Sequence, residues 1–111
     1  MKDFKSKINN KSASFRNNKE AMKSLVSELN EYLKISHLQG NEIALKRAKE
    51  RGKSLTRDKI AKLLDKDSPF LELMPLAGLK HENGFGPGGT TIAGIGLVKN
   101  KLCIINANIG T

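Results

Sequence analysis

Apolar side chains recur at steps of three and four residues over the first third of the chain. From about Asn18 to Leu38 this spacing predicts an amphipathic helix, which Asn17 or Asn18 can cap and Gly40 ends. Its apolar positions are Met22, Leu25, Val26, Leu29, Tyr32 and Leu33. Residues 1–14 show no such period and are rich in Lys, Asn and Ser, which predicts a disordered leader.

Two shorter helices should follow the first one. We expect one over residues 41–51, ended by Gly52 in a left-handed conformation, and another from Thr56 to about Asp65, capped by Thr56. Ser68-Pro69 prevents a continuation of the last helix. Residues 70–76 are apolar but contain Pro75, so we expect an extended, packed segment rather than a central strand.

The end of the chain has the pattern of a β-hairpin. Residues 90–98 and 102–108 are rich in Ile, Val and Leu and are separated by residues 99–101. Ile92 and Val98 point to one face of the first run, and Ile95 and Leu97 to the other. Strands that are apolar on both faces belong inside a layered sheet. The remaining residues do not supply two covering layers, and the chain stops soon after the second run. We therefore expect an incomplete α/β (α+β) domain.

Composition adds a charge asymmetry to this picture. The chain has 111 residues, room for one domain, and a net charge of +9. The first 66 residues hold 17 basic and 8 acidic side chains, and the rest hold 3 of each, so the whole excess lies in the first part. A basic part of this kind suits nucleic acid, an anionic membrane or a nucleotide phosphate, or is a solubilising surface.

Cysteine content and hydropathy point to a compartment. The single cysteine, Cys103, forms no internal disulfide, and no apolar run reaches the length that spans a bilayer. The first 14 residues hold no Arg and have no amphipathic pattern, unlike a mitochondrial presequence. We expect a bacterial cytoplasmic location, ahead of a mitochondrial matrix.

Several apparent motifs carry no chemistry. Residues 84–89 satisfy GxGxxG, but a dinucleotide site needs these glycines between a strand and a helix, and here a loop precedes them and a strand follows. Cys103 lies in an apolar run and is expected to be a buried, inert thiol. His37 and His81 have no metal-ligand spacing. We assign no catalytic, cofactor-binding or metal-binding residue.

Basic residues crowd the end of the second predicted helix and the turn that follows. They are Arg47, Lys49, Arg51 and Lys53, with Arg57 and Lys59 at the start of the third helix. Such a cluster can pair with phosphate oxygens. Cations also stabilise the carboxyl end of any helix, so the sequence leaves both interpretations open.

Three runs in the middle of the chain resemble a known family. Residues 51–60, Leu63-Leu64-Asp65 and Ser68-Pro69-Phe70-Leu71-Glu72-Leu73 are similar to the opening of carboxyltransferase (beta) subunits of biotin-dependent acyl-CoA carboxylases. Those subunits read RGKL and then LLD-x-x-SPFLEL. Residues 94–96 and 104–108 are similar to that family's first strands, and residues 15–29 to the N-terminal helix of its methylcrotonoyl-CoA branch. The family continues Ala-Asn-Asp, whereas Ile109 follows Asn108 here, which favours a truncated or fragmentary reading frame.

The resemblance implies a fold and an activity. The fold would be crotonase-like, with a leader over residues 1–14, a helical segment over 15–66 and the truncated start of the CoA carboxyltransferase N-terminal domain over 67–111. A complete subunit would transfer carboxylate to an acyl-CoA such as 3-methylcrotonyl-CoA from carboxybiotin, carried by a partner alpha subunit. It would work in a homo-oligomer of beta subunits. Its oxyanion glycines lie beyond this chain, so the fragment itself would bind no cofactor and would not catalyse transfer alone.

Two further expectations concern binding. If this chain touches substrate, Arg51 and Lys53 are the candidates for contact with CoA phosphates, because they lie in the basic cluster and in the most specific motif. The alternative from another class is a small basic module that binds RNA or DNA. The two strands that are apolar on both faces argue against a complete module, because they need covering on each side. No membrane partner is expected, and the acyl group stays open.

Overall fold

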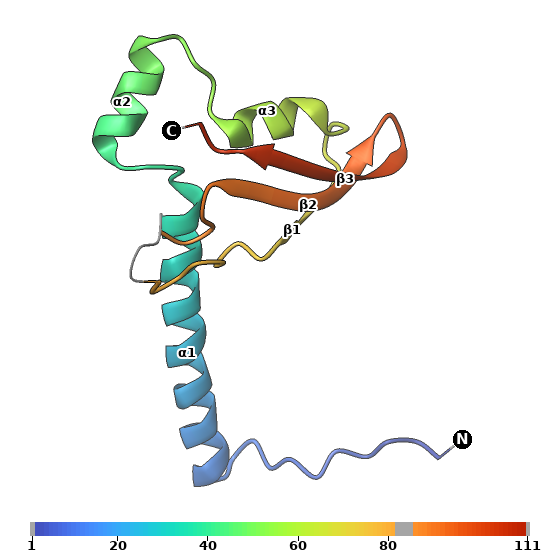
Figure 1. Ribbon diagram of the computed structural model, residues 1–111. Coiled ribbons are helices and arrows are strands. Elements are labelled where there is room, and N and C mark those ends of the chain that lie inside the picture. The colour runs from blue at the N-terminus through green and yellow to red at the C-terminus, as the bar shows by residue number, and fades with distance from the viewer. Residues whose placement is uncertain (1, 82–85, 111) are drawn as a thin grey trace. The chain divides into compact units, whose positions relative to one another are not determined.

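The described part of the protein has three helices followed by a three-stranded sheet. The structure is a computed structural model, and it describes residues 2–81 and 86–110. The helices are α1 (Ala13–His37), α2 (Glu42–Glu50) and α3 (Thr56–Leu63), and the strands are β1 (Phe70–Leu73), β2 (Thr91–Val98) and β3 (Lys101–Asn108) (Figure 1). The chain divides into two compact units, Met1–Glu31 and Tyr32–Thr111.

The first unit contains the beginning of α1. The helix starts at Ala13, earlier than Asn18, so the expected cap at Asn17 or Asn18 is wrong. Ser12 performs that role, since its hydroxyl accepts a hydrogen bond of 3.2 Å from the amide of Phe15. Residues 2–12 form no helix or strand, and the disordered leader stays a prediction. Neither α1 nor any other helix in the described residues is apolar enough to cross a membrane.

The start of α3 differs from the expectation in one respect. The helix begins at Thr56, but its cap position is Leu55, whose side chain makes no capping bond. The Thr56 hydroxyl instead donates a hydrogen bond of 3.0 Å to the carbonyl of Asn108 at the end of β3. The expected Thr56 cap is therefore wrong, because a tertiary contact with the sheet uses its hydroxyl. The helix ends at Leu63, two residues before Asp65.

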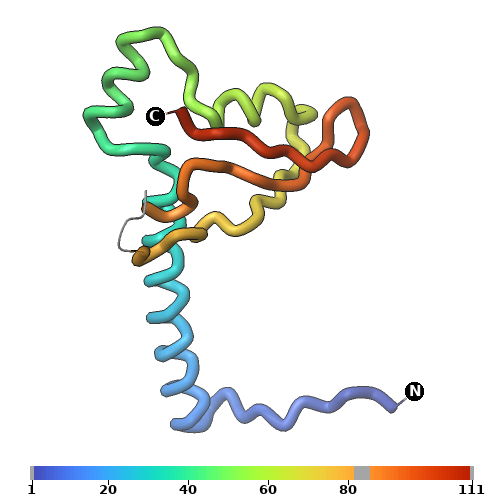
Figure 2. The backbone as a smooth tube through the Cα atoms, in the orientation of Figure 1, coloured from blue at the N-terminus to red at the C-terminus, as the bar shows by residue number. Residues whose placement is uncertain are grey.

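The sheet is antiparallel and has the strand order β1-β2-β3. β1 lies at one edge, which confirms an extended segment outside the centre over residues 70–73. The expected extension to residue 76 is wrong, because residues 75 and 76 lie in a turn, and Leu71 is exposed rather than packed. A two-residue turn joins β2 to β3, visible in the tube of Figure 2. Its residues, Lys99 and Asn100, have φ angles of 49° and 63°. Both angles are positive, as a type I′ hairpin turn requires.

Asp65 ties the end of α3 to this turn. Its carboxylate accepts hydrogen bonds from the amides of Lys99 and Asn100 at 2.6 and 2.7 Å. Its own amide donates to the carbonyl of Leu97 at 2.9 Å. One side chain therefore satisfies both amides of the turn and fixes the helix against the hairpin.

The hydrophobic core lies between α3 and one face of the sheet. Ile60 of α3 packs with Ile92 and Ile105, and partly buried neighbours complete the cluster: Leu64, Phe70, Val98, Ala107 and Ile109. On this face β2 presents Gly94 and Gly96, which are buried. A Cβ at Gly94 would overlap the ring of Phe70 and lie 2.7 Å from the carbonyl oxygen of Leu71. The sequence interpretation of these glycines as sites of close packing is confirmed.

Cys103 is less buried than expected. It points to the same face as Ile105, but it is only half-buried, so the prediction of a buried thiol is wrong. The reason is its place on β3, which pairs with β2 along one side only in the described residues. The side chain lies opposite Gly96 in the register.

The two strand glycines give a stability prediction. We expect Gly94→Ala to lower the free energy of unfolding by about 1–3 kcal/mol, since the new methyl group meets an aromatic ring and a backbone oxygen. Gly96→Ala should cost less, because its methyl group meets Leu64 Cδ2, the movable end of a side chain. Urea unfolding of the two variants, followed by circular dichroism, measures the difference. Equal costs would contradict the packing described here.

Candidate functional site

Arg51 and Lys53, the predicted substrate contacts, flank the glycine that ends α2. Gly52 has a φ angle of +64°, and its amide donates to the carbonyl of Lys49 at 3.0 Å. The amide of Lys53 donates to the carbonyl of Ala48 at 2.9 Å. These two bonds form a Schellman motif, which confirms the predicted left-handed glycine. The motif fixes the backbone on both sides of Gly52 and leaves the two cationic side chains exposed.

The other cations of the cluster separate into two groups. Arg47 and Lys49 lie in the last turn of α2, next to Arg51 and Lys53, so one helix end carries four positive charges. Arg57 has a different role, because its guanidinium is bound to Glu72. Arg51 and Lys53 therefore lie together at the end of α2, whereas Arg57 is held in its ion pair with Glu72.

The Arg57–Glu72 pair joins α3 to β1. Arg57 Nη1 donates to Glu72 Oε2 at 2.8 Å and Nη2 donates to Oε1 at 2.7 Å, a bidentate arrangement. The side chains are only 20% and 16% exposed. Gln39 Oε1 accepts from the Arg57 amide at 3.0 Å, and His37 Nε2 lies 3.9 Å from Glu72 Oε2. Sequence reasoning missed this pair.

The surroundings of Glu72 favour its ionised form. The hydrogen bonds from Arg57 lower the pKa of the Glu72 carboxyl below its ordinary value of 4.5. Partial burial raises the pKa in opposition, while the charges of Arg57 and His37 lower it further. Because both oxygens are held by one guanidinium, Glu72 acts as a structural link between elements rather than as a proton acceptor.

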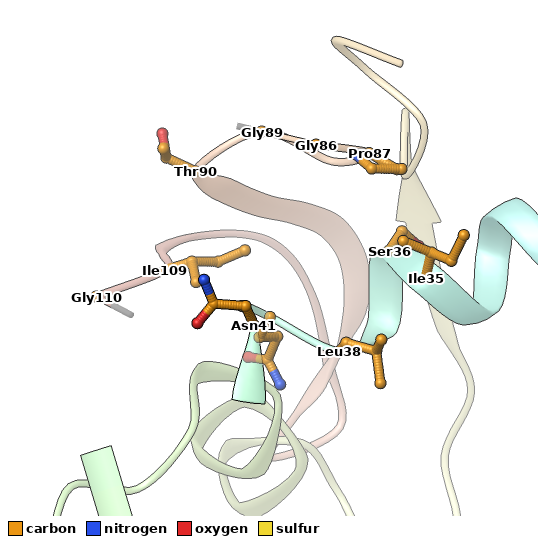
Figure 3. A pocket seen from close by; sticks show the side chains of 12 residues that line it. Ile35, Ser36, Leu38, Asn41, Gly86, Pro87, Gly89, Thr90, Ile109 and Gly110 are labelled. Carbon is orange, nitrogen blue, oxygen red and sulfur yellow. The ribbon is translucent and has the colours of Figure 1, made fainter. Parts of the chain in front are cut away.

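A pocket of about 670 Å³ lies at the end of α1 within the second unit. Three segments line it: the end of α1 with the residues that follow it, the glycine-rich segment before β2, and the residues after β3 (Figure 3). Ile35, Leu38 and Ile109 contribute apolar side chains, and none of the lining residues in ranges 2–81 and 86–110 is ionisable. Asn41 Oδ1 is used to cap α2 through the Ala44 amide. The pocket therefore suits a neutral group and offers no charged catalyst.

The GxGxxG match falls partly outside the described residues, which do not include Gly84 and Phe85. Gly86, Gly88 and Gly89 are described and have positive φ angles. The amide of Gly88 donates to the carbonyl of Ala77 at 2.9 Å. These glycines lead into β2, as expected, and no helix follows them, so the arrangement differs from a dinucleotide-binding site.

The titratable side chains of the described residues form no metal-binding group. No group of three or more His, Cys, Asp or Glu residues there could hold a metal ion. His37 Nδ1 lies 2.6 Å from the carbonyl oxygen of Leu33 within its own helix. Cys103 Sγ contacts only the carbonyl oxygen of Lys101, at 3.5 Å, among the hydrogen bonds described for it.

Comparison with known proteins shows which proteins this chain is similar to. A scan against protein-family models found no match. The chain is 48% identical over 87 residues, 78% of its length, to the biotin-dependent 3-methylcrotonyl-coenzyme A carboxylase beta1 subunit of Mycobacterium tuberculosis. It is 39% identical over 101 residues, 91% of its length, to the mitochondrial methylcrotonoyl-CoA carboxylase beta chain of Arabidopsis thaliana. The chain is homologous to a segment of acyl-CoA carboxylase beta subunits.

A solved structure supports the same assignment. The beta subunit of geranyl-CoA carboxylase from P. aeruginosa matches 96% of this chain with a TM-score of 0.81 and 33% identity. The helices and the small antiparallel sheet thus match a fragment of the crotonase-like carboxyltransferase fold, as the resemblance implied. The 111-residue chain covers 16% and 17% of the length of the two curated relatives and 20% of the length of the solved chain. None of these names indicates nucleic-acid binding.

The lowered pKa of Glu72 gives a pH prediction. Because the folded pKa lies below the unfolded value, the carboxylate stabilises the fold above about pH 4.5, and this contribution disappears as pH falls through the lowered pKa. Glu72→Gln should therefore cost about 1–3 kcal/mol at pH 7 and progressively less toward pH 3. Urea unfolding at several pH values checks this in a His37→Gln background, which removes the nearby imidazole. A cost that is independent of pH would contradict the assignment.

Proposed function

We propose that the chain serves as part of the carboxyltransferase subunit of a biotin-dependent acyl-CoA carboxylase. The reaction would move carboxylate from carboxybiotin to an acyl-CoA, with 3-methylcrotonyl-CoA as the first candidate. The observation that carries this proposal is the 48% identity over 87 residues to a subunit named for that reaction. Geranyl-CoA is the second candidate acyl group, because the matching solved structure is named for it at 33% identity.

The chain's own share of this function is binding and architecture. Carboxyl transfer through an enolate-type oxyanion needs amide donors fixed at about 3 Å from the oxygen. The resemblance places the family's oxyanion glycines outside this chain, and the described residues contain no group of His, Cys, Asp or Glu that could hold a metal ion. We therefore propose that the chain is not catalytic alone.

The proposal includes partners and a location. Carboxybiotin would arrive on a biotin-carrying alpha subunit, and beta subunits would form a homo-oligomer, as the resemblance implies. The curated relatives include a bacterial protein and mitochondrial ones. We propose the bacterial cytoplasm, because the relative that is 48% identical is a bacterial protein.

Arg51 and Lys53 are proposed as contacts for the phosphates of CoA. Both side chains are exposed, and the Schellman motif holds their backbone positions two residues apart at the end of α2. An Arg binds phosphate oxygens through its planar fork, and a Lys acts as a mobile point charge. Arg47 and Lys49 in the preceding turn add to the positive potential that a polyanion would meet there.

A charge reversal tests this contact. In a carboxylase holoenzyme that contains this chain, Lys53→Glu should raise the KM for acyl-CoA about tenfold, the effect of about 1.4 kcal/mol, with kcat unchanged. The variant loses one charged hydrogen bond to the phosphate. Because that bond forms in the ground state and in the transition state alike, its loss raises the KM and leaves kcat unchanged. Steady-state kinetics over a range of acyl-CoA concentrations provide the measurement.

Lys62→Glu is the matched control for that experiment. Lys62 is also an exposed lysine in the last turn of a helix, on α3 rather than α2. The KM should rise for the Lys53 variant and stay near the wild-type value for the Lys62 variant. An unchanged KM in Lys53→Glu, or equal increases in the two variants, would end the proposed phosphate contact.

A further inference from the structure

One side chain joins the two ends of the segment between α1 and α3. Gln39 follows the end of α1, and its Oε1 accepts a hydrogen bond of 3.0 Å from the amide of Arg57 in the first turn of α3. The two residues are 18 positions apart in the sequence. Residues 40–56, which include α2 and the turn of residues 51–53, therefore begin and end at the same place.

The first turn of α3 takes this acceptor from outside the helix. The cap residue, Leu55, makes no side-chain capping bond, and the Thr56 hydroxyl binds the carbonyl of Asn108. Amides in the first turn of a helix have no partner within the helix, so the Arg57 amide needs an acceptor from elsewhere. Gln39 supplies that acceptor and replaces the missing local cap.

Both partners of this hydrogen bond are held by the fold. Gln39 is only 7% exposed, although glutamine is mostly found on protein surfaces. Its φ angle of +57° lies in the left-handed region, which residues other than glycine seldom adopt. The guanidinium of Arg57 is bound to Glu72 on β1. The bond thus joins the start of the segment to a residue that is fixed against the sheet.

α2 carries this anchor to the turn with the basic side chains. Asn41, two residues after Gln39, caps the helix through the Ala44 amide at 2.9 Å. The Schellman bonds at the other end of α2 fix the backbone around Gly52. No other helix or strand of the described residues comes close to the backbone of α2. The position of residues 51–53 therefore depends strongly on the two ends of the segment.

We propose that Gln39 is a positioning residue for the phosphate contact of Arg51 and Lys53. The inference rests on the proposed function, because it takes that contact as given, and it adds the residue that holds the two cations in place. Two side chains bind one phosphate together only while their backbone keeps its place relative to the rest of the substrate site. Without the Gln39 acceptor, only the α3 end of the segment stays anchored, and the turn spreads over a range of positions.

Gln39→Met in a carboxylase holoenzyme that contains this chain tests the proposal. Methionine is similar in length and unbranched, but it offers no oxygen to the Arg57 amide. The KM for acyl-CoA should rise about threefold, as expected when about a third of the molecules keep the turn in place, with kcat unchanged. With the matching acyl-pantetheine, which has no phosphate, the kinetics should equal those of the wild type. That result would also show that the variant is folded.

Gln39→Glu is the matched control for that variant. Its carboxylate can accept from the same amide, and a helix N-terminus favours a negative charge. The KM for acyl-CoA should therefore stay near the wild-type value. Hydrogen exchange over residues 40–57 of the holoenzymes measures the anchor without any substrate. Exchange should be faster in Gln39→Met and close to the wild-type rate in Gln39→Glu.

The outcomes separate the positioning role from the phosphate contact. An unchanged KM in Gln39→Met, while Lys53→Glu raises it, would overturn the positioning role alone, and so would unchanged hydrogen exchange in Gln39→Met. Equal KM increases in Gln39→Met and Gln39→Glu, or an increase with acyl-pantetheine, would also overturn that role, because the effect would not arise from the acceptor or the phosphates. An unchanged KM in both Lys53→Glu and Gln39→Met would end the phosphate contact and the positioning role with it.

Discussion

The close contact between Phe70 and the backbone of β2 is the constraint on which the second unit depends. Gly94 leaves the space that the Phe70 ring fills, and Gly96 leaves the space for Leu64. With the ring and the leucine in place, α3 can lie near enough for Ile60 to reach Ile92 and Ile105. The core is small, so the loss of one contact removes a large share of its packing. The same contact decides which face of the sheet the helix covers and which face stays open.

The motif that identifies the family has an architectural explanation in this structure. Within Leu64–Glu72, several characteristic residues hold one element against another. The Asp65 carboxylate binds the amides of the hairpin turn, and the Ser68 hydroxyl donates to the Asp65 carbonyl at 2.6 Å. The Phe70 ring fills the space beside Gly94, where a larger residue would have its Cβ, and Glu72 binds Arg57. The motif is thus specific because it connects α3 to the sheet. This structural role does not require any residue of the motif to take part in carboxyl transfer.

The sequence predicted those parts of the fold that local patterns determine. The helices, the hairpin and the extended segment before it follow from periodicity, and the Gly52 helix end follows from backbone preference. The errors at Thr56 and Cys103 have another origin, since each depends on where β3 lies in space. The Arg57–Glu72 pair spans 15 residues between a helix and a strand, and no periodic signal links such positions. The pocket could not be predicted from the sequence for the same reason, because three segments that are distant in the chain line it.

The position proposed for the CoA phosphates sets two electrostatic effects against each other. The carboxyl end of a helix carries partial negative charge, which opposes an anion by about 0.3–1 kcal/mol. At α2 the Schellman motif engages the carbonyls of Ala48 and Lys49 in hydrogen bonds, and this reduces the opposing field. Because Arg51 and Lys53 are exposed, an ion pair from each to a phosphate would contribute about 0.2–1 kcal/mol, and Arg47 and Lys49 at the same helix end would add to the attraction. In the proposed contact, the side chains rather than the backbone would therefore provide the affinity for a phosphate at this turn.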